Sequence, residues 1–296
     1  MIRSKFCCIH SNSILNNLSR ERKILSKRSI SLIGWSDSIA RSSIVGSTMN
    51  HLISFHQWSN LPWYGEITII TLMARGLIAF PLTVLQRRIL LRYEKLKPEI
   101  EALSMSLRNR IAEEAYLAGI SQKKSQQIFL KEMTKGINRL IVRDNCHPLK
   151  ASLVTFFQIP FWIILSNCFR NFARIYPDPN DPQLLQTYEQ LQTEGIFWFS
   201  NLTVPDPIGL LPFATILINL SIIQMHVAER RRLNIKDSKF IKIITNFSRI
   251  LSFGLLIVGL TLPADMSYYW FVSSSFGLLQ NIILRNPKMK SILKIK

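Results

Sequence analysis

The sequence has few of the residues on which enzyme and metal chemistry usually depend. Its 296 residues include 4 cysteines, 5 histidines and 11 glycines. The cysteines show no metal or redox spacing and predict no disulfide framework. A glycine-rich phosphate loop, a zinc-protease helix motif and a nucleophile-elbow serine motif are all missing. The sequence therefore predicts neither an enzyme nor a protein that holds a metal or a cofactor.

Acidic residues are also scarce. The chain has 18 Asp and Glu but 37 Lys and Arg, which gives a formal net charge of +19. A positive charge of this size is typical of proteins that bind nucleic acid or an anionic membrane surface. It is also typical of membrane proteins in which basic loops set the orientation. Zinc-finger spacing, RNP-like motifs and basic helices with interleaved aromatics are missing. We therefore expect no nucleic acid partner and turn to membranes.

Hydrophobic residues make up 48% of the chain and collect in long stretches. Each stretch has about 20 residues, the length that a helix needs to cross the hydrocarbon core of a bilayer. The stretches cover residues 67–85, 149–169, 208–227, 243–262 and 266–284. The sequence thus predicts an all-α integral membrane protein with a bundle of five transmembrane helices.

The charges between these stretches predict their orientation. Basic residues gather after the first, third and fifth stretches, whereas the connection between the second and third carries five acids against two arginines. Basic loops stay on the side from which a membrane protein is inserted. With five spans, all three basic segments fall on that side. The N-terminus is then predicted outside, and the short basic tail of residues 286–296 inside.

The N-terminal 50 residues are basic, rich in serine and poor in acids. This composition is typical of an organellar transit peptide, and no uninterrupted apolar core supports a secretory signal. We predict a mitochondrial transit peptide and disordered region over residues 1–50 and a lead-in in the intermembrane space over residues 51–66. The inner side is then the matrix. A plastid transit peptide and a disordered basic tail with no targeting role are the alternatives.

The loop of residues 86–147, between the first two stretches, is too long for a plain connector. Apolar residues recur at helical spacing in two runs, one from Ile100 to Ile111 and one from Phe129 to Leu140. Gly119–Ser121 supplies a turn between them. We predict an amphipathic helical hairpin on the matrix face, with a solvated spacer as the alternative.

One charged residue, Arg75, lies within the first stretch. It is about eight residues, or roughly 12 Å, from either end. An arginine at that depth costs about 2.5–3.5 kcal/mol. The other four stretches contain no acid to pair with it, since Glu66 and Asp265 lie at stretch ends. We expect Arg75 to face a hydrated cavity; an arginine capped by carbonyls and snorkelling is the alternative.

Other polar and amphipathic side chains at membrane depth could line the same cavity. Thr71 precedes Arg75 by four residues and so shares its helical face. Together these residues predict a polar groove. The predicted groove residues are Arg75, Thr71, Gln158, Asn219, Trp270 and Gln280. An interface anchor is the alternative for Trp270, and close helix packing is the alternative for the serines Ser273, Ser274 and Ser275.

Short motifs along the chain, in order, resemble those of the YidC/Oxa/Alb family of membrane insertases. The resemblance covers roughly Trp63 to Pro287. The motifs are Arg75–Thr83 with Gln86, Leu96–Ile100, Gln158–Trp162, Trp198-Phe199 with Pro205–Pro207, and Leu262–Ala264 with Tyr269, Trp270 and Gln280.

The resemblance implies a five-helix insertase core over residues 67–285 with a groove open to the matrix and to lipid. It implies that Arg75 keeps this groove positive and hydrated, and that Thr71 and Trp270 meet the inserting segment. The partners would be newly made membrane proteins and the bilayer. The family usually has small or apolar residues at the outer turn occupied by Asp265. This carboxylate is either harmlessly solvated or tunes what leaves the groove.

The tail after the last stretch is short, whereas general ribosome-coupled mitochondrial members carry a long basic extension. The chain therefore resembles the branch devoted to cytochrome c oxidase assembly, which helps export the C-terminal domain of oxidase subunit 2. Accessory assembly factors are further possible partners. A general Oxa-type insertase or plastid homologue is the first alternative. An anion transporter or channel and a passive assembly scaffold are the others.

Overall fold

The computed structural model describes residues 37–232 and 239–293. The transit peptide predicted for the N-terminus thus lies mostly outside the described residues. Within these two ranges the ordered elements are helices, and extended pairing is limited to two isolated bridges, Ile196 with Phe199 and Pro205 with Pro263. The prediction of an all-α protein is confirmed.

The first long helical unit contains a π-helical turn. It consists of α3 (Trp63–Met73), the π-helix η1 (Ala74–Ala79) and α4 (Phe80–Lys95). The backbone N–H of Phe80 donates to the carbonyl of Arg75, five residues back. Pro81 follows at once, and a proline cannot donate the ordinary i to i−4 hydrogen bond. The wider π-helical turn accommodates the missing N–H of Pro81, and Arg75 is part of this turn.

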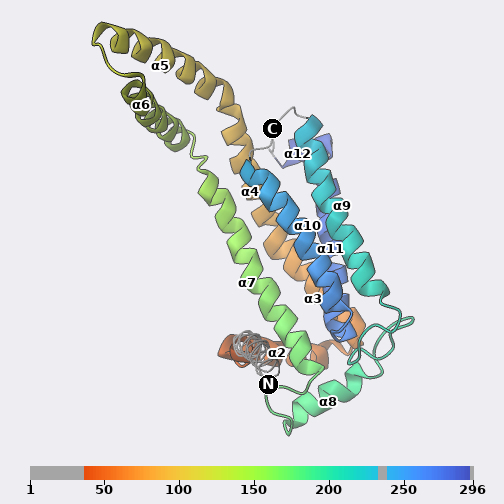
Figure 1. Cartoon of the computed structure of the whole chain (residues 1–296). Coiled ribbons are helices and arrows are strands. Elements are labelled where there is room, and N and C mark those ends of the chain that lie inside the picture. Colours follow the sequence, from red (N-terminus) through yellow and green to blue (C-terminus); the bar gives the residue numbers. More distant parts are fainter. Residues whose placement is uncertain (1–36, 233–238, 294–296) are drawn as a thin grey trace, which may run out of the picture.

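Four other long helices run beside this unit: α7 (Pro148–Phe172), α9 (Leu210–Arg232), α10 (Lys239–Gly259) and α11 (Ala264–Ile283). Figure 1 shows them roughly aligned. α11 contacts α3, α7 and α9, while α10 packs on α9 at the margin. Among the described residues, three helical segments are long and apolar enough to cross a membrane: Trp63–Leu117, Leu210–Arg232 and Ile241–Gly259.

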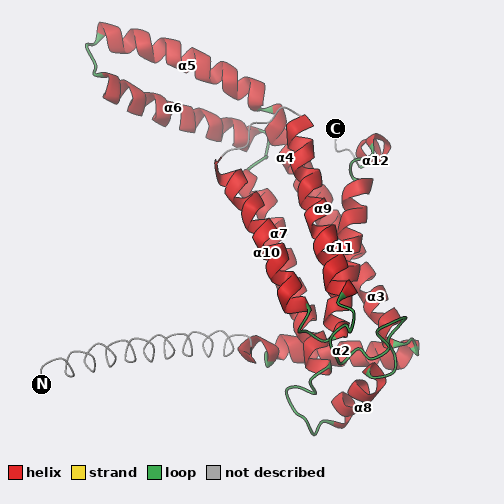
Figure 2. Ribbon diagram, turned by 45° about the vertical axis from the view of Figure 1, so that its right-hand side comes forward, coloured by secondary structure: helices red, strands yellow, loops and turns green. Residues whose placement is uncertain are grey.

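Two antiparallel helices, α5 (Lys97–Leu117) and α6 (Gln122–Arg143), project beyond the ends of the long helices (Figure 2). The break between them falls at Gly119, whose φ of +59° suits glycine. Arg143 pairs with Glu99 across the base at 3.0 Å. The short helix α12 (Pro287–Ile292) lies at the same end of the molecule (Figure 1).

The opposite end is covered by α2 (Ser43–Ser59) and α8 (Pro182–Leu191). α2 begins inside the region predicted to be a disordered leader, so ordered chain starts before residue 50. Its apolar residues Val45 and Met49 are buried against Cys168 and Phe172 of α7. The spacing of these positions gives α2 an apolar face that α7 covers, which explains its order.

A buried polar pair joins α2 to α3. His56 Nδ1 lies 2.6 Å from Glu66 Oε2, and the imidazole stacks on Trp63 with ring centroids 4.3 Å apart. Glu66 is fully buried. The acid nearest to Arg75 in the sequence is therefore engaged elsewhere.

Asp265 at the start of α11 is also fully buried, so its interpretation as a harmlessly solvated residue is wrong. Its backbone N–H donates to the Leu202 carbonyl at 3.0 Å, and its carboxylate accepts from the Met266 N–H at 2.5 Å. The loop that contains Leu202 covers this turn, which the sequence pattern did not reveal. A carboxylate in the first turn of a helix is favoured by the exposed N–H groups there.

Asp206 caps the start of α9. Its carboxylate accepts from the backbone N–H of Ile208 at 3.1 Å and of Leu211 at 2.7 Å, and from the indole N–H of Trp198 at 3.0 Å. The side chain is only 7% exposed. It therefore ties the connecting loop to the first turn of a long helix.

We predict that Asp206→Ala lowers the free energy of unfolding by about 1–2 kcal/mol, the usual cost of a lost helix cap. Chemical unfolding of the purified protein in detergent measures this. Asp178→Ala is the control, because Asp178 is exposed and its carboxylate accepts a local N–H from Asn180 without capping a long helix. An equal loss in both variants would contradict the capping role.

Candidate functional site

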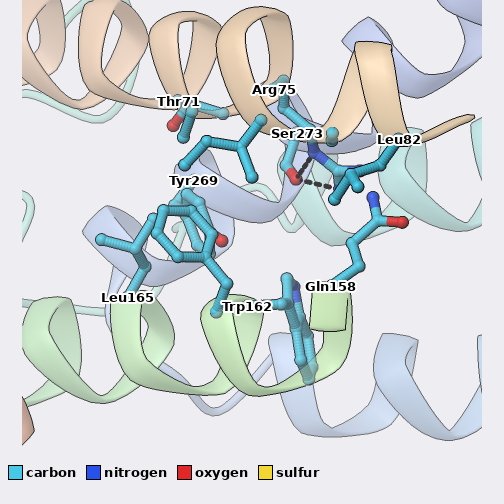
Figure 3. A pocket seen from close by; sticks show the side chains of 12 residues that line it. Thr71, Arg75, Leu82, Gln158, Trp162, Leu165, Tyr269 and Ser273 are labelled. Carbon is cyan, nitrogen blue, oxygen red and sulfur yellow. Dashed lines mark hydrogen bonds between the residues drawn. The ribbon is translucent and has the colours of Figure 1, made fainter. Parts of the chain in front are cut away.

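The guanidinium of Arg75 is held by a neutral oxygen. Its Nε donates to Ser273 Oγ of α11 at 2.9 Å, and a terminal nitrogen donates to the same oxygen (Figure 3). Within the two described ranges, no carboxylate lies within 4 Å of it. The charge of Arg75 is therefore not cancelled by an acid of this chain.

A small, mostly apolar cavity of about 40 Å³ lies on one side of Arg75. Figure 3 shows Gln158 and Trp162 of α7 on the wall opposite Arg75. The polar and aromatic residues that line it are Thr71, Arg75, Gln158, Phe161, Trp162, Tyr269 and Ser273. The hydroxyl of Thr71 donates to its own helix, to the Ile67 carbonyl at 2.6 Å. This cavity is a narrow apolar space with one charged edge.

A second cavity of about 720 Å³ opens on the other side of the guanidinium. Arg75, Gln158 and Ser273 line both cavities, so the two meet at Arg75. Further polar residues of its wall are Thr83, Gln86, Arg87, Glu94, Asn219, His226, Glu229, Arg230, Ser274, Gln280, Asn281 and Lys290. A space this large and polar accommodates water.

Five of the six predicted groove residues line these cavities, among them Thr71 in the first and Asn219 and Gln280 in the second. Trp270 lines neither of the two. Its ring stacks on Trp162 at 5.5 Å, and its indole N–H donates to Ser166 at 3.1 Å. Consecutive side chains on a helix point about 100° apart, so Trp270 points away from the cavity that Tyr269 lines. Tyr269 and Ser273, four residues apart, occupy the cavity face instead.

The groove predicted from the sequence did not include several of the wall residues, among them Tyr269, Trp162, Arg87 and Asn281. The spacing of Tyr269 to Ser273 was a usable signal, since residues four apart share a helical face. Arg87 was interpreted only as an orientation signal. Its side chain donates to Asn281 Oδ1 at 2.9 Å, which required knowledge of how α4 and α11 pack.

We predict that Ser273→Ala costs less than about 1 kcal/mol of unfolding free energy, because water in the cavity can replace the lost acceptor. Ser166→Ala is the matched comparison, since Ser166 accepts from Trp270 in a closely packed position. Leaving that indole N–H unsatisfied should cost about 1–3 kcal/mol. Both values come from denaturant unfolding in detergent. The opposite order would indicate a dry, structural arginine.

Comparison with known proteins agrees with the family resemblance. The sequence model of the family described as 60Kd inner membrane protein matches residues 54–291. The chain is 35% identical over 262 residues to the human "Cytochrome c oxidase assembly protein COX18, mitochondrial", which covers 88% of this chain and 77% of that protein. The Mus musculus protein of that name is 32% identical over the same shares.

A second set of relatives is more distant. The chain is 30% identical over 251 residues to the "Mitochondrial inner membrane protein OXA1L" of Mus musculus, which covers 85% of this chain and 52% of that protein. The family match extends over most of the chain and includes every element that lines the two cavities. This chain therefore belongs to the 60Kd inner membrane protein family, the YidC/Oxa/Alb insertases, and is similar to its cytochrome c oxidase assembly members.

Proposed function

We propose that this chain is an insertase of the mitochondrial inner membrane that inserts newly made membrane proteins and serves cytochrome c oxidase assembly. The observation that carries the proposal is Arg75. Its guanidinium is held by a neutral hydroxyl and lies where a narrow apolar cavity meets a wide polar one. A cation in this position attracts an acidic segment of a client without holding it permanently.

In this proposal five helical units cross the membrane: α3–η1–α4, α7, α9, α10 and α11. Three of the five contain segments that are long and apolar enough to do so. α7 has 25 residues and α11 has 20. At about 1.5 Å per residue, each is long enough for a hydrocarbon core of about 30 Å. Both pack directly on the apolar helices, which supports a common span.

The orientation proposed places α5, α6 and α12 in the matrix, and α2 and α8 in the intermembrane space. The described parts of the three basic segments all belong to the end of the molecule that carries α5, α6 and α12 (Figure 1). Basic segments remain on the matrix side. The N-terminus then lies in the intermembrane space and the C-terminus in the matrix, with α5 and α6 as the matrix hairpin.

The mechanism is physical, and no covalent step is needed. An acidic client segment enters the wide polar cavity from the matrix and is drawn to Arg75. Water in this cavity shortens the distance over which the carboxylate must be desolvated, which lowers the barrier to crossing. Beyond Arg75 the walls become apolar, with Phe161, Trp162 and Leu165. The client's hydrophobic segment then moves into lipid, and burial of its apolar surface drives the step.

The client proposed is the C-terminal domain of cytochrome c oxidase subunit 2, with accessory assembly factors as further partners. The names of the human and mouse relatives, which are oxidase assembly proteins, support a client that belongs to this oxidase. A general insertase is the second candidate, because similarity extends to proteins named OXA1L. The range of clients that the chain contacts decides between them.

We predict that Arg75→Ala slows client insertion about 10- to 100-fold, the effect expected when a hydrogen bond to a charged group is lost. Arg75→Lys should keep most of the activity, because the positive charge remains. Assembled oxidase and client export in mitochondria, at equal protein levels, measure both. Normal assembly with Arg75→Ala would exclude the groove mechanism and leave a passive scaffold. Anion flux through purified protein in liposomes would favour a transporter.

We predict that a photocrosslinker at Thr71 or Asn219 captures the tail of oxidase subunit 2 in mitochondria that translate their own proteins. Leu217 is the matched control for Asn219, because it lies on the same helix with its side chain 51% exposed on the apolar surface. Equal capture from Leu217 and Asn219 would argue against a groove. Capture of many different nascent chains would identify a general insertase.

A further inference from the structure

A second arginine in the wide cavity is held in the same way as Arg75. The guanidinium of Arg87, on α4, donates to the amide oxygen of Asn281 on α11 at 2.9 Å. Asn281 is itself fixed, because its amide nitrogen donates to the Gly277 carbonyl at 2.9 Å. Among residues with described side chains, no carboxylate lies within 4 Å of Arg87. Both arginines therefore have an exchangeable neutral acceptor and, among the described side chains, no carboxylate in direct contact.

The acids in the same cavity make no ion pair with Arg87, although Glu229 attracts its guanidinium through space. Glu229 accepts from Arg285 at 3.0 Å and lies 3.8 Å from Lys290, so it is already paired with two cations. Glu94, the other acidic wall residue, makes no ion pair with Arg87. The wall also contains Arg230. The mouth of the cavity is thus a region of net positive charge beside an unpaired guanidinium.

The two arginines mark two levels of one groove. Their acceptors, Ser273 and Asn281, are eight residues apart on α11 and therefore roughly 12 Å apart along its axis. Arg87 lies toward the matrix end proposed above, since α4 continues from it into α5. Arg75 lies deeper, at the junction with the apolar cavity.

We propose that Arg87 is a second client-binding residue, which captures an acidic side chain at the matrix mouth before Arg75 receives it. A guanidinium binds a carboxylate through charge-assisted hydrogen bonds that are stronger than its hydrogen bond to an amide oxygen. A client carboxylate can therefore displace Asn281. The inference rests on the proposed function and extends it from one cation to two.

The geometry also defines the substrate class. An extended chain advances about 3.3–3.6 Å per residue, so residues four apart are about 13–14 Å apart. Such residues also point to the same side of an extended chain. A tail with two acids four residues apart can thus contact Arg87 and Arg75 together. We expect clients of this pattern to be inserted faster than clients with a single acid.

The adjacent residue provides a matched control. Arg88 donates through two nitrogens to the Leu293 carbonyl, at 3.0 and 2.7 Å, and lines neither cavity. Arg88→Gln removes the same charge from the same helix at a side chain that lines neither cavity. It separates a binding role of Arg87 from a general effect of basic charge near the mouth.

The test uses the full chain in vesicles and synthetic clients with one hydrophobic segment. The client tails carry two aspartates four residues apart, one aspartate, or asparagines in their place. Protection of the tail from added protease gives the insertion rate. We expect Arg87→Gln to slow the two-aspartate client about tenfold, to the rate of the one-aspartate client, as for one lost charge-assisted hydrogen bond. The asparagine client should be unaffected, and Arg87→Lys should retain most of the rate.

Several results would overturn the inference. Equal slowing of the asparagine client would indicate a structural role for Arg87, and equal slowing by Arg88→Gln would indicate a general charge effect. Slowing that appears only in vesicles with anionic lipid, whatever the tail, would assign Arg87 to a lipid headgroup. If Arg75→Gln slows acidic clients and Arg87→Gln does not, only this inference fails. If Arg75→Gln also has no effect, the proposed function fails too.

Discussion

The architecture around Arg75 depends on one constraint: a guanidinium in an apolar helix that has no carboxylate to pair with. Glu66 is engaged by His56, and Asp265 is buried at the far turn, so neither acid reaches it. A lone charge in a dry interior would cost far more than folding could offset. In this protein the guanidinium donates to a neutral acceptor, Ser273, and lies beside a wide polar cavity. The groove is the condition under which this arginine is tolerated.

The same constraint connects structure to the proposed activity. A guanidinium paired with a carboxylate of its own chain would gain little binding energy by exchanging it for a client's carboxylate. One that rests on a serine hydroxyl can exchange, because a charged acceptor forms the stronger hydrogen bond. The π-helical turn before Pro81 places Arg75 toward α11, where this acceptor lies. A local backbone irregularity, imposed by one proline, thus helps to set the charge of the groove.

The two cavities differ in polarity: the small one is mostly apolar and the wide one is much more polar. In the proposed function, the walls with Gln86, Asn219 and Gln280 keep a client's polar tail hydrated, and the walls with Phe161 and Trp162 receive its apolar part. Arg75 lies where the two meet. An insertase needs this gradient because its clients contain both polar and apolar segments. No residue needs to form or break a bond, in keeping with the scarcity of cysteine and histidine in the sequence.

The sequence alone determined that the protein is helical and that Arg75 has no acidic partner at its depth, since both follow from which residues stand in each apolar stretch. It also marked Thr71, Gln158, Asn219 and Gln280, whose polarity is unusual there. Only the tertiary structure decided that Trp270 packs behind Trp162 and that Asp265 is buried. It alone placed Arg87 against Asn281. These outcomes depend on the rotation and packing partners of each helix, which a hydropathy pattern does not specify.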